Sequence, residues 1–116
     1  PGGGPGTERL KADERVLATV ADFNAKGKTV AAICAAPTVL AAAGVLNGRA
    51  ATCYPGCEEG LKGARYTAKG PVVSDKNILT SQGPGTSFAF ALALVERLAG
   101  KTAADKVAAD LLYRAG

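Results

Sequence analysis

The sequence predicts an α/β fold, in which strands of a mainly parallel sheet alternate with helices that cover both faces. Short runs with β-branched residues, such as 29–33 and 77–81, precede stretches of good helix formers. Apolar residues make up 47% of the 116-residue chain, which is enough to fill the core of one small domain. The chain contains no internal repeat, so these observations predict a single α/β domain.

The first third of the chain predicts a loop, a helix, a strand and a second helix. The opening PGGGPG is a loop by composition, and the segment after it places apolar residues at helical spacing until Gly27 ends the helix. Residues 29–33 predict a strand that is buried on both faces. Residues 35–43 predict a helix that tolerates Pro37 in its first turn. A loop followed at once by a helix implies a strand before Pro1, so we expect the sheet to be incomplete at its N-terminus.

The rest of the chain continues the alternation with short strands and three helices. The predicted strands cover residues 50–53, 65–67, 72–74 and 77–81. A small helix follows the turn at 54–56, and a long apolar helix begins at Thr86 or Ser87 and ends near Leu98. The last helix spans about residues 102–113.

Composition and charge exclude several classes of partner. The 14 basic and 10 acidic residues leave a net charge of +4 that is spread along the chain, whereas nucleic-acid binders gather basic residues in a patch. The longest nearly apolar run, residues 30–46, is shorter than the roughly 20 residues that a membrane-spanning helix needs. We therefore expect neither nucleic acid nor a membrane as a partner.

The chain has three cysteines, at positions 34, 53 and 57, and no histidine. An odd number of cysteines without a secretion signal favours free thiols in the cytoplasm. Three thiols without histidine cannot complete a four-ligand zinc site, so neither a metal nor another cofactor is predicted. The chain contains no methionine and opens at Pro1, so we expect it to be a piece of a longer protein.

Cys34 lies in the segment Ala32-Ile33-Cys34-Ala35-Ala36, between a predicted strand and a predicted helix. A nucleophile on such a sharp turn has strained backbone angles, and the residues two positions away must be small, a condition that alanine meets. The start of a helix also favours thiolate over thiol, through the helix dipole and free amide donors. The alternative is that Cys34 is a small apolar residue buried in an alanine-rich layer.

Three motifs together resemble the ThiJ/PfpI family: PGG at the start, AAICAAPTVL around Cys34, and TSQGPGTSFAFALALVE downstream. The similarity covers nearly the whole chain. It implies a flavodoxin-like three-layer sandwich, in which residues 1–116 form the C-terminal portion of a single ThiJ/PfpI (class I glutamine amidotransferase-like) domain. It also implies a cysteine-dependent glyoxalase or deglycase that acts on reactive aldehydes such as methylglyoxal or their glycated adducts, and a homodimer, because relatives are commonly dimers.

The resemblance also assigns roles within the site. Cys34 corresponds to the family's elbow cysteine, which is oxidised or adds to carbonyl substrates. The amides of Gly3 and Ala35 correspond to the family's oxyanion-binding donors. The residues expected to line the pocket are Gly2, Tyr54 and Pro55. Composition alone describes the opening PGG as a flexible turn.

Two departures from the family pattern bear on the chemistry. Several relatives carry a histidine where this chain has Tyr54, so a Cys-His relay of the peptidase or amidotransferase kind cannot be built from these residues. Peptidase activity is disfavoured further because those members place a histidine directly after the cysteine, where this chain has Ala35. The family's glutamate, which meets the elbow cysteine from an early strand, is expected upstream of Pro1.

Other interpretations stay open. The chain is alternatively an oxidative-stress sensor or chaperone, in which oxidation of Cys34 to sulfinate alters partner binding. A structural role is favoured for Cys53 and Cys57, with a resolving thiol or a secondary oxidation site as the alternative. The turn Gly83-Pro84-Gly85 lacks the lysine of a phosphate-binding loop, which favours structural capping or a subunit contact.

Overall fold

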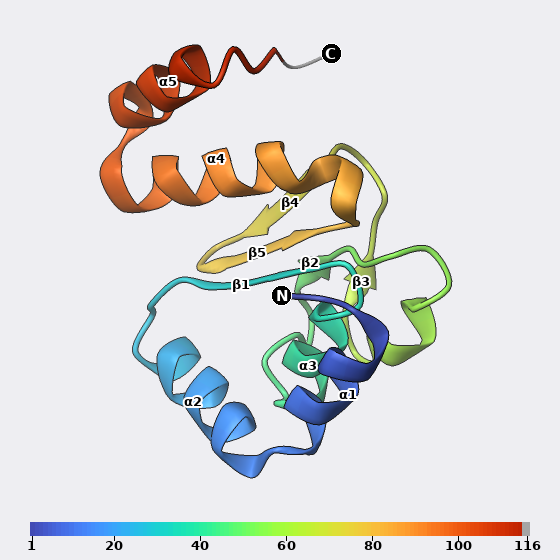
Figure 1. The fold of residues 1–116 in the computed structure, drawn as a ribbon. Coiled ribbons are helices and arrows are strands. Elements are labelled where there is room, and N and C mark those ends of the chain that lie inside the picture. The colour runs from blue at the N-terminus through green and yellow to red at the C-terminus, as the bar shows by residue number, and fades with distance from the viewer. Residues whose placement is uncertain (115–116) are drawn as a thin grey trace.

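The computed structural model describes residues 1–114 and shows a small sheet with helices on both sides (Figure 1). The strands are β1 (Val30–Ile33), β2 (Ala50–Ala51), β3 (Arg65–Tyr66), β4 (Val72–Asp75) and β5 (Ile78–Ser81). The helices are α1 (Gly4–Ala12), α2 (Glu14–Ala25), α3 (Pro37–Ala42), α4 (Ser87–Ala99) and α5 (Lys101–Asp110), with short 3-10 helices η1 (Glu58–Gly60) and η2 (Pro84–Thr86). Helices α2 and α3 contact β1, whereas α4 covers β4 and β5 and carries α5 on its outer side.

The main sheet has the strand order β1-β5-β4, and a second ladder joins β2 to β3. Strand β1 runs parallel to β5, with Val30 opposite Ile78 and Ile33 opposite Ser81. The β2–β3 pairing is also parallel, and only β4–β5 is antiparallel. The predicted α/β class is therefore confirmed. Within residues 1–114, the other edge of β1 pairs with no strand.

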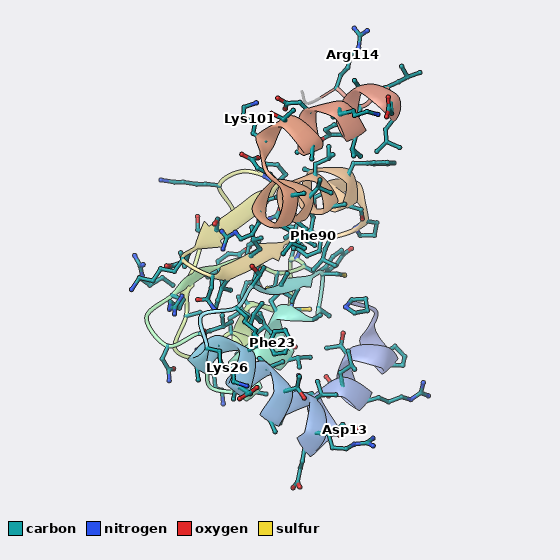
Figure 2. The ribbon with its side chains drawn as sticks, turned by 90° about the vertical axis from the view of Figure 1, so that its left-hand side faces the viewer. Asp13, Phe23, Lys26, Phe90, Lys101 and Arg114 are labelled. Carbon is teal, nitrogen blue, oxygen red and sulfur yellow. The ribbon has the colours of Figure 1, made fainter. Side chains whose placement is uncertain are left out.

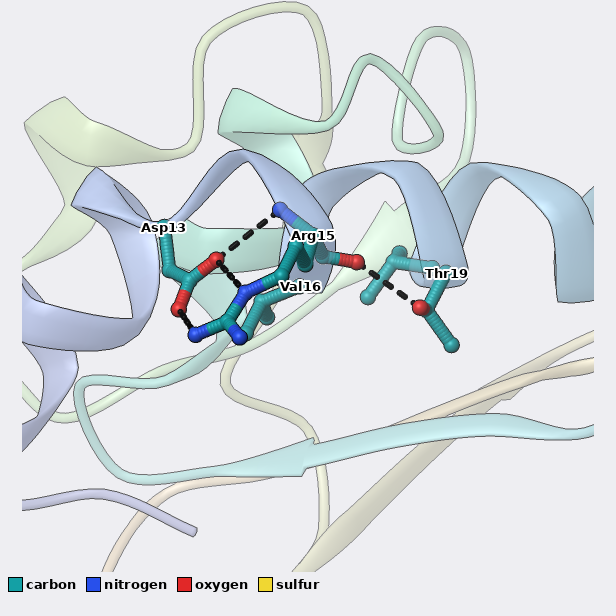
Figure 3. A pocket seen from close by; sticks show the side chains of 5 residues that line it. Asp13, Arg15, Val16 and Thr19 are labelled. Carbon is teal, nitrogen blue, oxygen red and sulfur yellow. Dashed lines mark hydrogen bonds and ion pairs between the residues drawn. The ribbon is translucent and has the colours of Figure 1, made fainter.

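The N-terminal helix predicted as one element is two helices, and the first begins inside the predicted loop. Helix α1 starts at Gly4 because Pro5, in its first turn, needs no amide partner there. Asp13 then takes an extended conformation and caps α2, with its carboxylate accepting the Arg15 amide at 2.9 Å. The Arg15 guanidinium binds the same carboxylate, and these bonds lower the pKa of Asp13 to about 2 (Figure 3).

The other elements differ from the predictions mainly at their ends. The predicted strand 50–53 stops at Ala51, because the next amide, that of Thr52, donates to the Thr80 hydroxyl at 3.0 Å. The last helix ends at Asp110 rather than near Tyr113. The longest helix, α4, has 13 residues, and no helix among residues 1–114 combines the length and apolar character needed to cross a membrane.

The hydrophobic core lies between β1, β5 and α3. Its buried members are Val30, Ala32, Ala36, Leu40, Val45, Leu46, Ala51, Cys53, Leu61 and Ile78. Phe90 lies on the side of α4 nearest the sheet, whereas Lys101 and Arg114 lie at the outer end of the molecule (Figure 2). Ala32 and Ala36 belong to this core, so core residues flank Cys34 on both sides in the sequence.

Leu46 and Leu98 provide a matched test of this core. Leu46 is 1% exposed and Leu98 is 75% exposed. We expect Leu46→Ala to lower the free energy of unfolding by about 2–5 kcal/mol, because it removes buried contacts and leaves a cavity. Leu98→Ala should change it by less than about 0.5 kcal/mol. Urea unfolding followed by circular dichroism measures both values, and equal losses would contradict the placement of the core.

Candidate active site

Cys34 lies at the turn where β1 ends. Its φ angle is 68°, in the left-handed region that non-glycine residues rarely adopt. Ala35 and Ala36 form the turn, and α3 begins only at Pro37. Ala32 and Ala36, two positions on either side of the cysteine, are 4% and 3% exposed, so larger side chains would not fit. The small-x-Cys-x-small pattern thus marks a strained elbow in the backbone.

Two backbone hydrogen bonds hold the elbow in place. The Cys34 amide donates to the Ser81 carbonyl at 3.0 Å, and the Cys34 carbonyl accepts the Tyr54 amide at 2.8 Å. Ser81 ends β5, the parallel neighbour of β1, and Tyr54 lies in the loop after β2. The strained residue therefore has both of its backbone polar groups satisfied by separate segments of the fold.

The segment after β5 supports this anchor. The Ser81 hydroxyl lies 2.6 Å from the Thr86 hydroxyl, which donates to the Gly83 carbonyl at 2.9 Å. Thr86 occupies the predicted N-cap position of α4, but its side chain makes no capping bond to that helix. The Gly-Pro-Gly turn is thus tied to the strand end that binds the Cys34 amide.

Gly2 packs directly against the elbow. A Cβ atom added to Gly2 would lie 2.5 Å from Cys34 Cβ and 2.8 Å from the Ile33 carbonyl oxygen. Both distances are below van der Waals contact. The backbone at residue 2 can therefore approach Cys34 this closely only because residue 2 is glycine and has no Cβ atom. The opening PGG is therefore a fixed part of the site rather than a flexible turn.

The backbone amides of Gly2, Gly3 and Ala35 donate no hydrogen bond within residues 1–114. A Cβ added to Gly2 would lie 3.3 Å from the Ala35 nitrogen, which shows that the two segments meet here. Most backbone donors in a folded protein have a partner. A free backbone amide directly after a cysteine, such as that of Ala35, is a donor suited to an anionic oxygen.

The structure also brings Tyr54 to the elbow. Its amide binds the Cys34 carbonyl, and its ring packs on Gly83, where an added Cβ would come within 3.2 Å of Tyr54 Cδ1. Tyr54 is 48% exposed, and Pro55 beside it is also exposed. The aromatic ring thus lies at the surface against Gly83, while the Tyr54 backbone binds the elbow.

The helix-dipole part of the prediction is weaker than expected. Helix α3 has six residues and starts three positions after Cys34, so the cysteine is not in its first turn. A short helix contributes little to the field at its N-terminus. Within the turn, the Cys34 and Ala36 amides are bonded to Ser81 and Ile33, so the Ala35 amide is the free donor nearest in sequence to the sulfur.

The three cysteines are free thiols in different environments. Cys53 is fully buried, and its burial, with neighbouring Cys57, Glu58 and Cys34 adding to the effect, raises its pKa to about 11. Cys34 and Cys57 are half-buried. Among the described residues, no group of three or more His, Cys, Asp or Glu side chains is arranged to hold a metal ion.

Two hollows are relevant to access. One of about 260 Å³ lies between α1, α3 and η1, and it includes Ala35 and Cys57 in its wall. The other, of about 390 Å³, runs along the first turns of α2 and is lined by Asp13, Arg15, Val16, Thr19 and Val20 (Figure 3). Only the first hollow touches the elbow, so the α2 groove is not assigned to the site.

Sequence reasoning did not identify Ser81 as part of the site. In the parallel pairing of β1 and β5, Ser81 lies opposite Ile33, the last residue of β1. This pairing places Ser81 next to the elbow. The register of two strands cannot be read from a single sequence without knowing which strands pair.

A strand, a strained cysteine and a helix in this order define an α/β protein with a nucleophile elbow. Residues 1–97 match the profile of the DJ-1/PfpI family, and the chain belongs to this family. The chain is 42% identical over 113 residues to Protein dj-1beta of Drosophila melanogaster, covering 97% of this chain and 60% of that protein. It is 39% identical over 116 residues to the Parkinson disease protein 7 homolog of Danio rerio, covering 98% and 61%.

A third relative carries an activity in its name. The chain is 41% identical over 101 residues to the Glutathione-independent glyoxalase DJR-1.2 of Caenorhabditis elegans, covering 84% of this chain and 53% of that protein. Among solved structures, Drosophila melanogaster DJ-1beta superposes with a TM-score of 0.95 at 40% identity, covering 99% of this chain and 62% of that one. The oxidised Toxoplasma gondii DJ-1 gives 0.91 at 40% identity, covering 99% and 62%.

The family resemblance and the fold class predicted from the sequence are confirmed by these comparisons. The chain spans about 60% of the length of the first two relatives.

Gly2 and Gly6 test the close packing at the elbow. We expect Gly2→Ala to destabilise the protein by about 1–3 kcal/mol, because the new methyl group meets backbone and Cβ atoms that cannot move away. It should also slow the reaction of Cys34 with a thiol reagent. Gly6→Ala is the matched control, because Gly6 lies in α1 with open space around it and alanine favours the helix. Thermal unfolding and labelling rates measure both effects, and a neutral Gly2→Ala would contradict the packing.

Proposed function

We propose that the protein is a cysteine-dependent glyoxalase or deglycase that acts on reactive aldehydes such as methylglyoxal or their adducts. The observation that carries the proposal is the strained Cys34, which is followed by the free Ala35 amide and packed by the segment that carries the free Gly3 amide. The name of the Caenorhabditis elegans relative supports the same chemistry.

The first step is addition of the Cys34 thiolate to the aldehyde carbon. The new carbon–sulfur bond leaves a negative charge on the former aldehyde oxygen, and the amides of Gly3 and Ala35 donate to that oxyanion. For methylglyoxal, a proton must then move from the former aldehyde carbon to the neighbouring carbon, and water must release the product acid. The aldehyde carbon is oxidised while the ketone carbon is reduced, so no external oxidant is needed. Release of the product acid by hydrolysis consumes one water.

The proton transfer needs an acid or base near the sulfur. Tyr54 replaces the histidine of several relatives, so we assign it to the pocket wall, together with Gly2 and Pro55, rather than to the relay. We propose that a glutamate outside residues 1–116 moves the proton, as the resemblance implies. The chemistry of the whole protein therefore depends on a group that these residues do not provide.

Cys34→Ser tests the proposed function directly. We expect it to reduce methylglyoxal turnover by the purified protein at least about a thousandfold, because a hydroxyl is a much weaker nucleophile than a thiolate at neutral pH. Cys53→Ala is the matched control, because Cys53 is fully buried, and it should retain turnover once its folding is verified. Product acid formation measures both rates. Unchanged turnover in Cys34→Ser would remove the proposal.

A second candidate function is a sensor of oxidative stress or a chaperone that responds to oxidation of Cys34. The same two amides favour it, because they suit an oxygen atom of an oxidised sulfur as well as a substrate oxyanion. Oxidation of Cys34 that alters partner binding, in a protein without carbonyl turnover, would favour this candidate. The three free thiols are typical of a reducing compartment, so we assign both candidates to the cytoplasm.

We also infer that the protein forms a homodimer through an apolar patch where the end of α5 meets the start of α4. Phe88, Leu111 and Leu112 are 56%, 52% and 85% exposed, and the Phe88 ring stacks on Tyr113 with ring centroids 5.7 Å apart. Exposed apolar patches mark interaction sites. We expect Leu112→Glu to convert a dimer into a monomer in light scattering, whereas Leu98→Glu, at the other end of α4, should not. A monomeric wild-type protein would contradict the inference.

A further inference from the structure

Three thiols gather around the loop that follows β2. The Tyr54 amide binds the Cys34 carbonyl at 2.8 Å, and the Cys57 amide binds the Tyr54 carbonyl at 2.9 Å. One backbone turn thus connects Cys57 to the elbow. Cys53 directly precedes Tyr54, so the same loop carries Cys53 and Cys57.

The three thiols differ in burial: Cys53 is buried, whereas Cys34 and Cys57 are partly exposed. Cys53 has no exposed surface, and its pKa of about 11 keeps it protonated at neutral pH. A protonated, buried thiol does not attack other sulfur atoms. Cys34 and Cys57 are both half-buried, so they are the two thiols able to react.

Cys57 opens into the hollow of about 260 Å³ whose wall also contains Ala35, the residue after Cys34. Thr7 belongs to the same wall, is 1% exposed, and has a hydroxyl with no hydrogen-bond partner among residues 1–114. A buried polar atom without a protein partner is usually satisfied by a small polar molecule. The hollow therefore suits water or a peroxide beside Cys57 and Ala35, the residue that follows Cys34.

The turn that carries Cys57 is at the surface. Tyr54, Pro55 and Gly56 are exposed, and Gly56 has a φ of 102°, which only glycine adopts readily. A disulfide needs its two Cα atoms about 4.4–6.8 Å apart. Cys57 itself packs against the core, so disulfide formation requires its surface turn to move toward Cys34.

We propose that Cys57 is a resolving cysteine that captures oxidised Cys34 in an intramolecular disulfide. The proposal rests on the same accessible Cys34 thiolate as the proposed function. It makes the pair Cys34 and Cys57 a reversible redox centre for hydroperoxides, distinct from carbonyl turnover.

The reaction balances in two steps, with a hydroperoxide as the oxidant. The Cys34 thiolate attacks the terminal peroxide oxygen, the O–O bond breaks, and an alcohol or water leaves as Cys34 becomes a sulfenic acid. The Cys57 sulfur then attacks the Cys34 sulfur, the S–O bond breaks, and water leaves as the disulfide forms. The two thiols lose two electrons and the peroxide gains them. An external thiol then reduces the disulfide by exchange and restores both cysteines as thiols, so Cys34 is protected from irreversible oxidation to sulfinate.

Intact mass after treatment with hydrogen peroxide tests the proposal. The wild-type protein should lose two hydrogens, and a non-reducing peptide map should link the peptides that carry Cys34 and Cys57. Cys57→Ser should instead gain two oxygens on Cys34, because the sulfenic acid is no longer captured. Cys53→Ala is the matched control and should still lose two hydrogens. A thermal unfolding scan verifies that each variant is folded.

Several results would overturn the proposal. The first is that wild-type Cys34 gains two oxygens at the rate seen in Cys57→Ser. The second is a disulfide between Cys53 and Cys57. The third is a disulfide that links two protein molecules. Methylglyoxal turnover is measured on the reduced wild-type protein in parallel. Turnover without the disulfide contradicts only this proposal, whereas the disulfide without turnover contradicts only the glyoxalase function.

Discussion

The site depends on the positive φ of one residue, Cys34, and on the two hydrogen bonds that keep it there. A non-glycine residue in this conformation is held at a cost of about 1–3 kcal/mol, so the surrounding structure must stabilise it. The Ser81 carbonyl holds its amide and the Tyr54 amide holds its carbonyl. The close packing of Gly2 against Cys34 and Ala35 brings the N-terminal segment to the same turn.

The parts of this arrangement that are local in sequence could be predicted. The strand that ends at Ile33 and the alanines around Cys34 follow from hydrophobicity, β-branching and the steric needs of the turn. Strand β5 and helix α4 likewise formed close to their predicted bounds, because a continuous apolar run and a long apolar helix are strong signals. The approach of Gly2 to the elbow could be predicted only through the family resemblance, since composition describes PGG as a flexible turn.

The parts that depend on contacts between distant segments could not be predicted. Asp13 divides one helical pattern into two helices by capping α2 with its carboxylate, although the apolar spacing continues across it. Ser81 reaches the Cys34 amide only because β5 pairs in parallel with β1. The hollow between α1, α3 and η1 joins residues from three separate segments, so the relation of Cys57 to Ala35 is visible only in the fold.

The most direct test of the account compares the reactivity of Cys34 in the folded and the unfolded protein. The account attributes its reactivity to the backbone geometry of the elbow, which is lost on unfolding. At neutral pH, iodoacetamide should therefore label Cys34 faster in the native protein than in the same protein unfolded in urea, despite the partial burial of the side chain. Labelling that is slower in the native protein would show that the elbow only shields the sulfur, which contradicts the central claim.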